Sequence, residues 1–233
     1  MLVIVDSRIP KAALVELEKH VQVLPFSSSG VVYDAISGHP DIFFCQTPFA
    51  LVAAPNTPEA FLKQLQKFGV NFLLGKSELG DTYPQTAHYN AFFSKACLVH
   101  NTKTTDVSIY ELAAEIEIIN VNQGYTRCNL IEAGGLYITS DNSILEALNL
   151  AGKDAFYISP YNIQLPGVKH GFFGGCAGYI NKKLFIVGSL QYLPEGKALA
   201  KKLEEREVTI IELYNGQLFD VGGVLVNERM MER

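Results

Sequence analysis

Short apolar runs recur along the chain, and each is followed by a polar turn and then by apolar residues spaced three and four apart. One such run is Leu51-Val52-Ala53, which precedes the turn Thr57-Pro58-Glu59. Equivalent runs begin at Leu2, Leu98, Leu136 and Leu184, so the pattern repeats after about 47 residues. The fifth copy is completed only if the C-terminal segment is joined to the first residues of the chain.

Each copy predicts two strands, a helix and a third strand, because alternating or continuous short apolar runs favour strands and 3.6-residue spacing favours a helix. The predicted first strands are residues 42–44, 91–93, 130–132, 177–180 and 224–226, and the second strands are the runs described above. The predicted helices are residues 10–20, 59–68, 107–114, 143–150 and 195–205. The predicted third strands are residues 21–26, 70–74, 116–121, 155–159 and 208–213.

A ββαβ unit of this size cannot bury both faces of its strands alone, so neighbouring copies must supply the other walls of the core. The sequence therefore predicts an α/β fold, a closed five-bladed ββαβ propeller with pseudo-fivefold symmetry. It forms a single domain over residues 1–233, with the fifth unit split between the C-terminus and residues 1–26. The strand at 224–226 is expected to pair with residues 2–5, which removes exposed sheet edges.

Composition narrows the class of protein further. The chain is 48% hydrophobic and 18% charged, as expected for a well-buried globular protein, and its formal net charge of −5 argues against broad nucleic-acid contact. The N-terminus lacks the basic region and cleavage site of a signal peptide, and its apolar run is too short to span a bilayer. The four cysteines show no CxxC spacing. We therefore expect a cytoplasmic protein without membrane contact; the oligomeric state is left open.

In a ring of like units, equivalent positions gather round the symmetry axis, so the residues just before the first strands are the candidate site. They are polar or reactive in all five copies: Asp41, Asn90, Asn129, Cys176 and Asp220. His39, His88 and Arg127 add ionisable groups two residues upstream of three of them. The pattern predicts a polar channel that binds a small molecule. Two alternatives stay open: Asp and Asn also form ordinary turns before strands, and Val224 could take the place of Asp220.

Cys176 lies in the glycine-dense stretch at 171–178 and is the candidate nucleophile, activated by His88 or His39. The alternative is a small buried core residue. No glycine pattern matches a dinucleotide or phosphate loop, so no cofactor is expected. A metal site built from His39, His88, Asp41 and Cys176 is conceivable, but these ligands are remote in the sequence, and no metal is predicted.

Five ββαβ units that close through a C-terminal strand resemble the pentein fold, which is shared by guanidine-modifying enzymes and the ribosome-associated initiation factor six family. The resemblance covers essentially the whole chain. In the enzymes, an acidic residue of the second unit binds the guanidinium, where this chain has Asn90. The third unit carries a Glu-Gly-Gly-Asp/Asn segment, which is matched only at Asn129. The fourth unit carries His-x-Asp, where this chain reads Gly174-Gly175-Cys176.

The nucleophilic cysteine of these enzymes lies in the last unit, and no cysteine follows Cys176 here. Cys176 occupies the equivalent position one unit earlier. Two functions therefore follow from the resemblance. The first is a site for a small cationic amino-acid-like, guanidino or amidino ligand, with C–N hydrolysis as the possible chemistry and Asp41 and Asp220 favouring the cation. The alternative is a non-catalytic ring that binds a protein or the ribosome.

Overall fold

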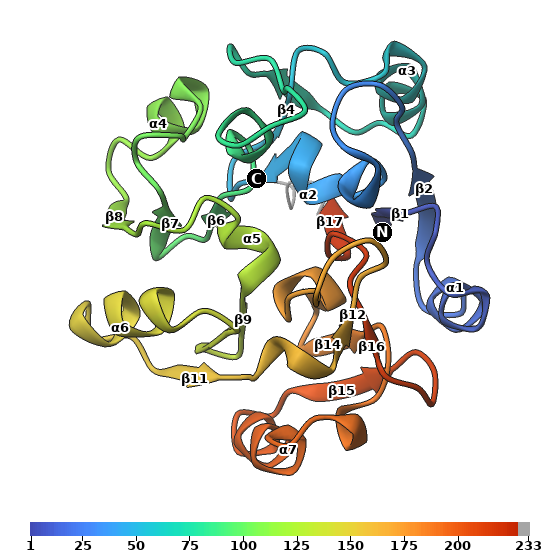
Figure 1. The fold of residues 1–233 in the computed structure, drawn as a ribbon, viewed down its shortest axis with the longest axis vertical. Coiled ribbons are helices and arrows are strands. Elements are labelled where there is room, and N and C mark those ends of the chain that lie inside the picture. The colour runs from blue at the N-terminus through green and yellow to red at the C-terminus, as the bar shows by residue number, and fades with distance from the viewer. Residues whose placement is uncertain (228–233) are drawn as a thin grey trace.

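Five three-stranded sheets with the same strand order make up most of the computed structural model, which describes residues 1–227. In each sheet the middle strand pairs antiparallel with the first strand and parallel with the third. A helix joins the second strand to the third, and Figure 1 shows these helices on the outside of the molecule. Unit 1 consists of β17 (Leu225–Asn227), β1 (Leu2–Asp6), α1 (Lys11–Glu18) and β2 (Gln22–Phe26), and unit 2 consists of β3 (Phe44–Gln46), β4 (Leu51–Ala53), α3 (Glu59–Lys67) and β5 (Phe72–Leu74). Unit 3 consists of β6 (Phe92–Phe93), β7 (Cys97–His100), α4 (Val107–Leu112) and β8 (Glu117–Asn120), and unit 4 consists of β9 (Leu130–Ala133), β10 (Leu136–Thr139), α6 (Asn142–Leu150) and β11 (Ala155–Tyr157). Unit 5 consists of β13 (Ala177–Ile180), β14 (Lys183–Ile186), α7 (Gly196–Glu204) and β15 (Thr209–Glu212).

Local sequence explains several of these boundaries. Gly134 and Gly135, at φ +61° and +82°, form the two-residue turn between β9 and β10, a conformation that glycine adopts without steric cost. Helix α4 begins after Asp106, whose carboxylate accepts a hydrogen bond from the Ser108 amide at 2.9 Å. Helix α6 begins after Asp141 in the same way. Such caps satisfy amides that have no partner within the helix.

Short helical turns precede the first strands of units 2 to 5, where the sequence predicts simple polar turns. They are α2 (Pro40–Phe43), η2 (Gln85–Ala87), α5 (Thr126–Asn129) and η4 (Gly174–Cys176). The remaining short elements are η1 (Asp34–Ile36), η3 (Pro160–Asn162), η5 (Leu190–Tyr192) and the parallel pair β12 (Ile163–Gln164) and β16 (Leu218–Phe219).

The predicted strand at 42–44 is wrong at its start, because Ile42 and Phe43 belong to α2 and the strand begins at Phe44. Pro40 stands at the first position of this turn, where its fixed φ favours a helical start. Both apolar residues are fully buried. Burial of consecutive apolar residues is common to strands and short helical turns, and the sequence pattern alone does not distinguish them.

The C-terminal strand β17 pairs antiparallel with β1, with Ile4 opposite Leu225, so the two ends of the described chain share one sheet. The first strands also contact one another between units: β17 contacts β3 and β13, β3 contacts β6, and β9 contacts β13. Phe92 of β6 and Leu130 of β9 belong to one apolar cluster. The first strands are thus neighbours in a circular order.

The core lies between neighbouring units rather than within each unit. Phe26 of unit 1 packs against Phe43 and Phe61 of unit 2, with ring centroids 4.9 and 4.7 Å apart. Phe92 of unit 3 packs against Tyr137 of unit 4 at 5.8 Å. Apolar clusters likewise join unit 4 to unit 5 and unit 5 to unit 1. Within residues 1–227, no helix is long and apolar enough to cross a membrane.

Replacement of Leu225 by Ala tests whether the C-terminal strand is part of the core. Leu225 is 1% exposed and belongs to the apolar cluster shared by units 1, 2 and 3. We expect Leu225→Ala to lower the free energy of unfolding by about 3 kcal/mol, as for a buried leucine elsewhere. Urea denaturation measures the change. Leu98→Ala, at a fully buried position of β7, is the matched control, and an effect of Leu225→Ala below about 0.5 kcal/mol would place Leu225 outside the core.

Candidate functional site

The turns that precede the first strands meet in the middle of the molecule, where α2, α5 and β17 lie in Figure 1. Asn90 joins three units. Its side-chain amide donates to the Asp41 carbonyl at 3.0 Å, and its side-chain carbonyl accepts from the Cys128 amide at 3.1 Å. The main-chain carbonyl of Asn90 accepts from the amide of Arg127 at 2.9 Å. One asparagine therefore sets the position of α2 and α5 relative to each other.

Arg127 continues this chain of contacts into unit 5. Its guanidinium donates to the carbonyls of Gly174 at 2.8 Å and Ala177 at 3.2 Å. The side chain is partly buried. Burial lowers the pKa of Arg127, while the charge of Asp41 opposes that shift. Arginine remains protonated in proteins, so this is a fixed positive charge at the centre.

Glycines complete the circuit between units 5, 1 and 2. The Gly175 carbonyl accepts from the Gly223 amide at 2.8 Å, and the Gly222 carbonyl accepts from the Asp41 amide at 3.3 Å. A Cβ at Gly175 would overlap the carboxylate of Asp220. Glycine is required there because the backbone passes so close to that side chain.

Cys128 and Asp41 are in direct contact at this centre. The Cys128 thiol donates to Asp41 Oδ2 at 3.0 Å, and the Asn90 amide donates to the Cys128 sulfur at 3.1 Å. Asp41 is fully buried and Cys128 is 4% exposed. The second oxygen of Asp41, Oδ1, has no hydrogen-bond partner among the described residues.

His39 lies beside this pair and is surrounded by carboxylates. Its Nδ1 is 3.8 Å from Asp220 Oδ1, and its Nε2 is 4.0 Å from Asp6 Oδ2. The ring is 1% exposed, and neither nitrogen has a hydrogen-bond partner within the described part of the chain. Asp6 itself is paired with Arg8 at 2.5 Å, and Asp220 accepts from the amides of Phe172 and Gly222.

Burial is the dominant influence on the ionisable groups of the centre. It raises the pKa of Asp41 to about 6, with the positive charge of Arg127 acting in the opposite direction. Burial also raises the pKa of the Cys128 thiol well above its usual value, and the charge of Asp41 adds to that shift. Burial lowers the pKa of His39, against the charges of Asp220 and Asp6. A cation bound here would favour the ionised forms of both Asp41 and Cys128.

The structure brings most of the predicted site residues together, through the contacts of Asp41, Asn90, Arg127, Asp220 and His39 described above. Asn129 accepts from the Ser140 hydroxyl at 3.0 Å and donates to the Tyr125 carbonyl, which gives it a structural contact at the end of α5. Val224, not Asp220, directly precedes the first strand of unit 1, yet Asp220 still reaches the centre through its contact with His39.

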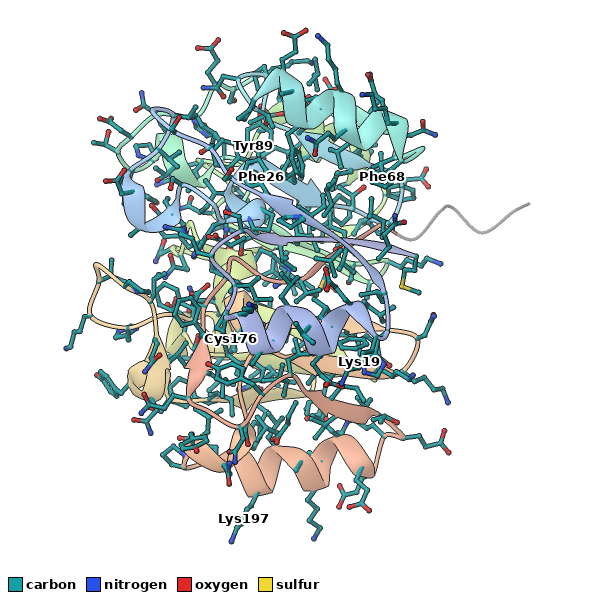
Figure 2. All side chains as sticks on the ribbon, turned by 90° about the vertical axis from the view of Figure 1, so that its right-hand side faces the viewer. Lys19, Phe26, Phe68, Tyr89, Cys176 and Lys197 are labelled. Carbon is teal, nitrogen blue, oxygen red and sulfur yellow. The ribbon has the colours of Figure 1, made fainter. Side chains whose placement is uncertain are left out.

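Cys176 and His88, the catalytic pair predicted from the sequence, form no hydrogen bond with each other in the described part of the chain. The thiol of Cys176 donates to the Phe172 carbonyl at 3.3 Å, and Nδ1 of His88 lies 2.7 Å from the Thr104 carbonyl. Figure 2 shows Cys176 in the interior, whereas Lys197 on α7 extends outward. Burial raises the pKa of the Cys176 thiol well above its usual value. A catalytic role for this pair stays a prediction.

Cys128 and Asp6 are the residues of this centre that sequence reasoning missed. Cys128 stands between two predicted residues, Arg127 and Asn129, and its position in the same pre-strand turn is the signal that identifies it. Asp6 is the last residue of β1, and a charged residue at the end of a buried strand is the corresponding signal. Neither signal indicates that the two side chains face His39 from different units.

The fold is that of the pentein enzymes, as comparison with solved structures shows. Agmatine deiminase from C. jejuni aligns with a TM-score of 0.53 and 12% identity over 93% of this chain and 78% of that chain. An amidinotransferase of the saxitoxin biosynthetic pathway from Microseira wollei aligns with a TM-score of 0.53 and 12% identity, covering 90% and 87%. DDAH from Pseudomonas aeruginosa, complexed with citrulline, aligns with a TM-score of 0.54 and 7% identity, covering 95% and 92%.

At these identities the similarity establishes the fold alone. The chain belongs to a family of unknown function, DUF6873, whose model matches residues 4–225. A sequence comparison with curated proteins gives no match.

The raised pKa of Asp41 predicts a specific pH dependence of stability. The pKa is about 6 in the folded protein and about 4 in an unfolded chain. The folded state therefore binds this proton more tightly, and the resulting stabilisation is present below about pH 4 and lost as the pH rises through about 6. Asp41→Asn cannot titrate, so its free energy of unfolding relative to the wild type should increase by about 2 kcal/mol between pH 4 and pH 7. Urea denaturation at both pH values measures this difference; a constant difference would contradict the assignment.

Proposed function

We propose that the five sheets form one closed five-bladed ββαβ propeller with pseudo-fivefold symmetry, a single pentein domain over residues 1–233. The unit split between the C-terminus and residues 1–26 is the fifth copy of the sequence repeat and unit 1 of the structure. The repeated strand order, the pairing of β17 with β1 and the circular order of contacts between first strands support this proposal. A closed ring directs the pre-strand turns of all five units toward one axis.

The polar centre of this ring binds a small cationic amino-acid-like, guanidino or amidino compound. The proposal rests on one observation: Asp41 and Asp220 are buried carboxylates in the same centre, and Asp41 Oδ1 has no hydrogen-bond partner among residues 1–227. Buried polar atoms are nearly always hydrogen-bonded, so an unpartnered carboxylate oxygen indicates a missing donor. The N–H groups of a cationic ligand supply that donor and balance the charge.

Arg127 is suited to bind the carboxylate of an amino-acid-like ligand, at the end opposite the cationic group. Its guanidinium makes two hydrogen bonds to carbonyls, and the side chain is partly exposed. A guanidinium carries five N–H donors, so others remain for a carboxylate. His39, Asn90 and Asn129 line or brace the same centre, and the ligand lies against the inner turns rather than at the outer helices.

C–N hydrolysis is the chemistry that this arrangement favours, with the thiol of Cys128 as nucleophile. A bound cation lowers the pKa of the thiol, and Asp41 Oδ2, 3.0 Å away, accepts its proton. The thiolate attacks the amidino carbon, and the C–N bond breaks as the leaving amine takes up that proton. Water then hydrolyses the C–S bond, which releases the product and restores the thiol. One ring nitrogen of His39 lies within 4.8 Å of the Cys128 sulfur and of an Asp41 carboxylate oxygen, which supports a role in proton exchange once the substrate closes this gap.

A thermal-shift screen tests ligand binding directly. We expect guanidino and amidino compounds, alone or as amino acids, to raise the melting temperature because they bind only the folded state. Asp41→Asn should abolish the shift, since it removes the carboxylate charge while keeping the shape. Neutral amides of the same size serve as ligand controls. If no cationic compound shifts the wild-type protein, the small-molecule function is wrong.

Two cysteine variants identify the nucleophile in any compound that proves to be hydrolysed. We expect Cys128→Ala to lose at least about 100-fold in kcat, because covalent catalysis requires the thiolate. Cys176→Ala removes an equally buried thiol and should retain activity. Product release by mass spectrometry gives the rates. Loss of activity in Cys176→Ala and His88→Ala, with full activity in Cys128→Ala, would restore the pair predicted from the sequence.

A non-catalytic ring that binds a protein or the ribosome is the second candidate, and the internal cation of Arg127 favours it. The guanidinium of Arg127 already interacts electrostatically with the carboxylates of Asp41 and Asp220, as a substrate guanidinium would. If this candidate is right, cationic compounds do not change the melting temperature of the wild-type protein. Arg127→Ala, which removes the internal cation, then gains a thermal shift with millimolar methylguanidinium, and Arg127→Lys does not. A shift in the wild type alone would exclude this candidate.

A further inference from the structure

Three metal-binding side chains from two units converge at the centre, although the sequence separates them. One imidazole nitrogen of His39, one carboxylate oxygen of Asp41 and the sulfur of Cys128 all lie within 4.8 Å of one another. Their exposed fractions are 1%, 0% and 4%. Helix α2 and the residues before it carry the first two, and α5 carries the third, so the hydrogen bonds of Asn90 to both segments create this arrangement.

Unpartnered atoms in this group point to a missing occupant. Both nitrogens of His39 and Oδ1 of Asp41 lack hydrogen-bond partners among the described residues. A buried imidazole without a donor or acceptor, next to a buried carboxylate oxygen in the same state, is costly unless a ligand or ion satisfies both. In the neutral imidazole of His39 one nitrogen carries a hydrogen and the other offers a lone pair to a cation, as does Asp41 Oδ1.

Charge balance indicates the valence of that cation. When Cys128 is ionised, it contributes one negative charge, and Asp41 and Asp220 contribute one each. Arg127 supplies one positive charge, whereas Asp6 is already paired with Arg8. Two negative charges are left over, which a divalent ion neutralises.

We infer that His39, Asp41 and Cys128 bind a divalent transition-metal ion of the zinc class. Thiolate and imidazole ligands favour Zn²⁺ and related ions over Mg²⁺ or Ca²⁺, which take oxygen ligands. Tetrahedral Zn²⁺ places its ligand atoms about 3.5 Å apart. The Cys128 sulfur is already 3.0 Å from Asp41 Oδ2, and all three ligand atoms lie within 4.8 Å of one another, so the side chains need only small adjustments to reach this spacing. The fourth position is left for water or a small ligand.

Metal binding and the proposed hydrolysis compete for Cys128. As a metal ligand the sulfur is held as a thiolate that shares an electron pair with the ion, which makes it a weaker nucleophile toward carbon. The inference concerns the same centre as the proposed function, but it does not require that a guanidino ligand binds or reacts. If both occupants bind, Zn²⁺ should suppress the ligand-induced thermal shift because both use Asp41.

Cobalt substitution provides a readout independent of activity. Chelator-treated protein is titrated with Co²⁺, and then Zn²⁺ is added. We expect about one equivalent of Co²⁺ to bind with a thiolate-to-cobalt charge-transfer band, and Zn²⁺ to displace it. Cys128→Ser should abolish the band and weaken Zn²⁺ binding at least about 100-fold. Cys176→Ser, a buried thiol outside the group, should keep both.

The outcomes separate this inference from the proposed function. Absence of Co²⁺ and Zn²⁺ binding, or a band that persists in Cys128→Ser, overturns the metal site even if guanidino compounds still shift the melting temperature. Conversely, metal binding without any such shift supports the metal site and removes the small-molecule function. His39→Gln, which keeps the cysteine, should also lose at least about 10-fold in Zn²⁺ affinity. Circular dichroism confirms that each variant is folded, and the His39→Gln result decides the matter if Cys128→Ser does not fold.

Discussion

The rest of this structure depends on a circuit of hydrogen bonds between the turns that precede the first strands. Asn90 joins Asp41 to Cys128, Arg127 joins α5 to η4, and the carbonyls of Gly175 and Gly222 carry the circuit back to Asp41. The helices that join the second strands to the third strands lie on the outside of the molecule and do not cover these turns (Figure 1). The polar groups of the turns therefore bond mainly to one another, whereas Asp41 Oδ1 and the two ring nitrogens of His39 have no hydrogen-bond partner within residues 1–227.

This arrangement of turns gathers ionisable side chains in a part of the molecule that is buried from water. Asp41, Asp220 and His39 are each at most 1% exposed, and Arg127 provides a positive charge that interacts with Asp41 and Asp220. A packed apolar centre would be simpler and would leave no unpartnered atoms. Because buried ionisable groups are costly and are seldom kept for stability alone, their presence is the main physical reason to place function at this centre.

Much of the architecture follows from the sequence, and the reasons are local. The second strands and the helices agree with the structure to within about two residues at each end, since apolar periodicity over four to ten positions is a strong signal. The predicted start of the strand β3 was wrong because Ile42 and Phe43 are buried in a helical turn rather than in a strand. At the site, the repeat pointed to Asp41, Asn90 and Asp220, but it selected Cys176 and missed Cys128, because Cys128 stands one residue before the repeated position at Asn129.

The sequence by itself determined the number, order and type of the units, because each ββαβ copy carries its own apolar spacing. It also determined which turns are polar. Only the tertiary structure decided that Cys128, rather than Cys176, contacts Asp41, and that His39 lies against Asp6 and Asp220. The physical reason is that side chains meet across units through the twist of each sheet and the length of each turn, and neither quantity can be read from spacing along one chain.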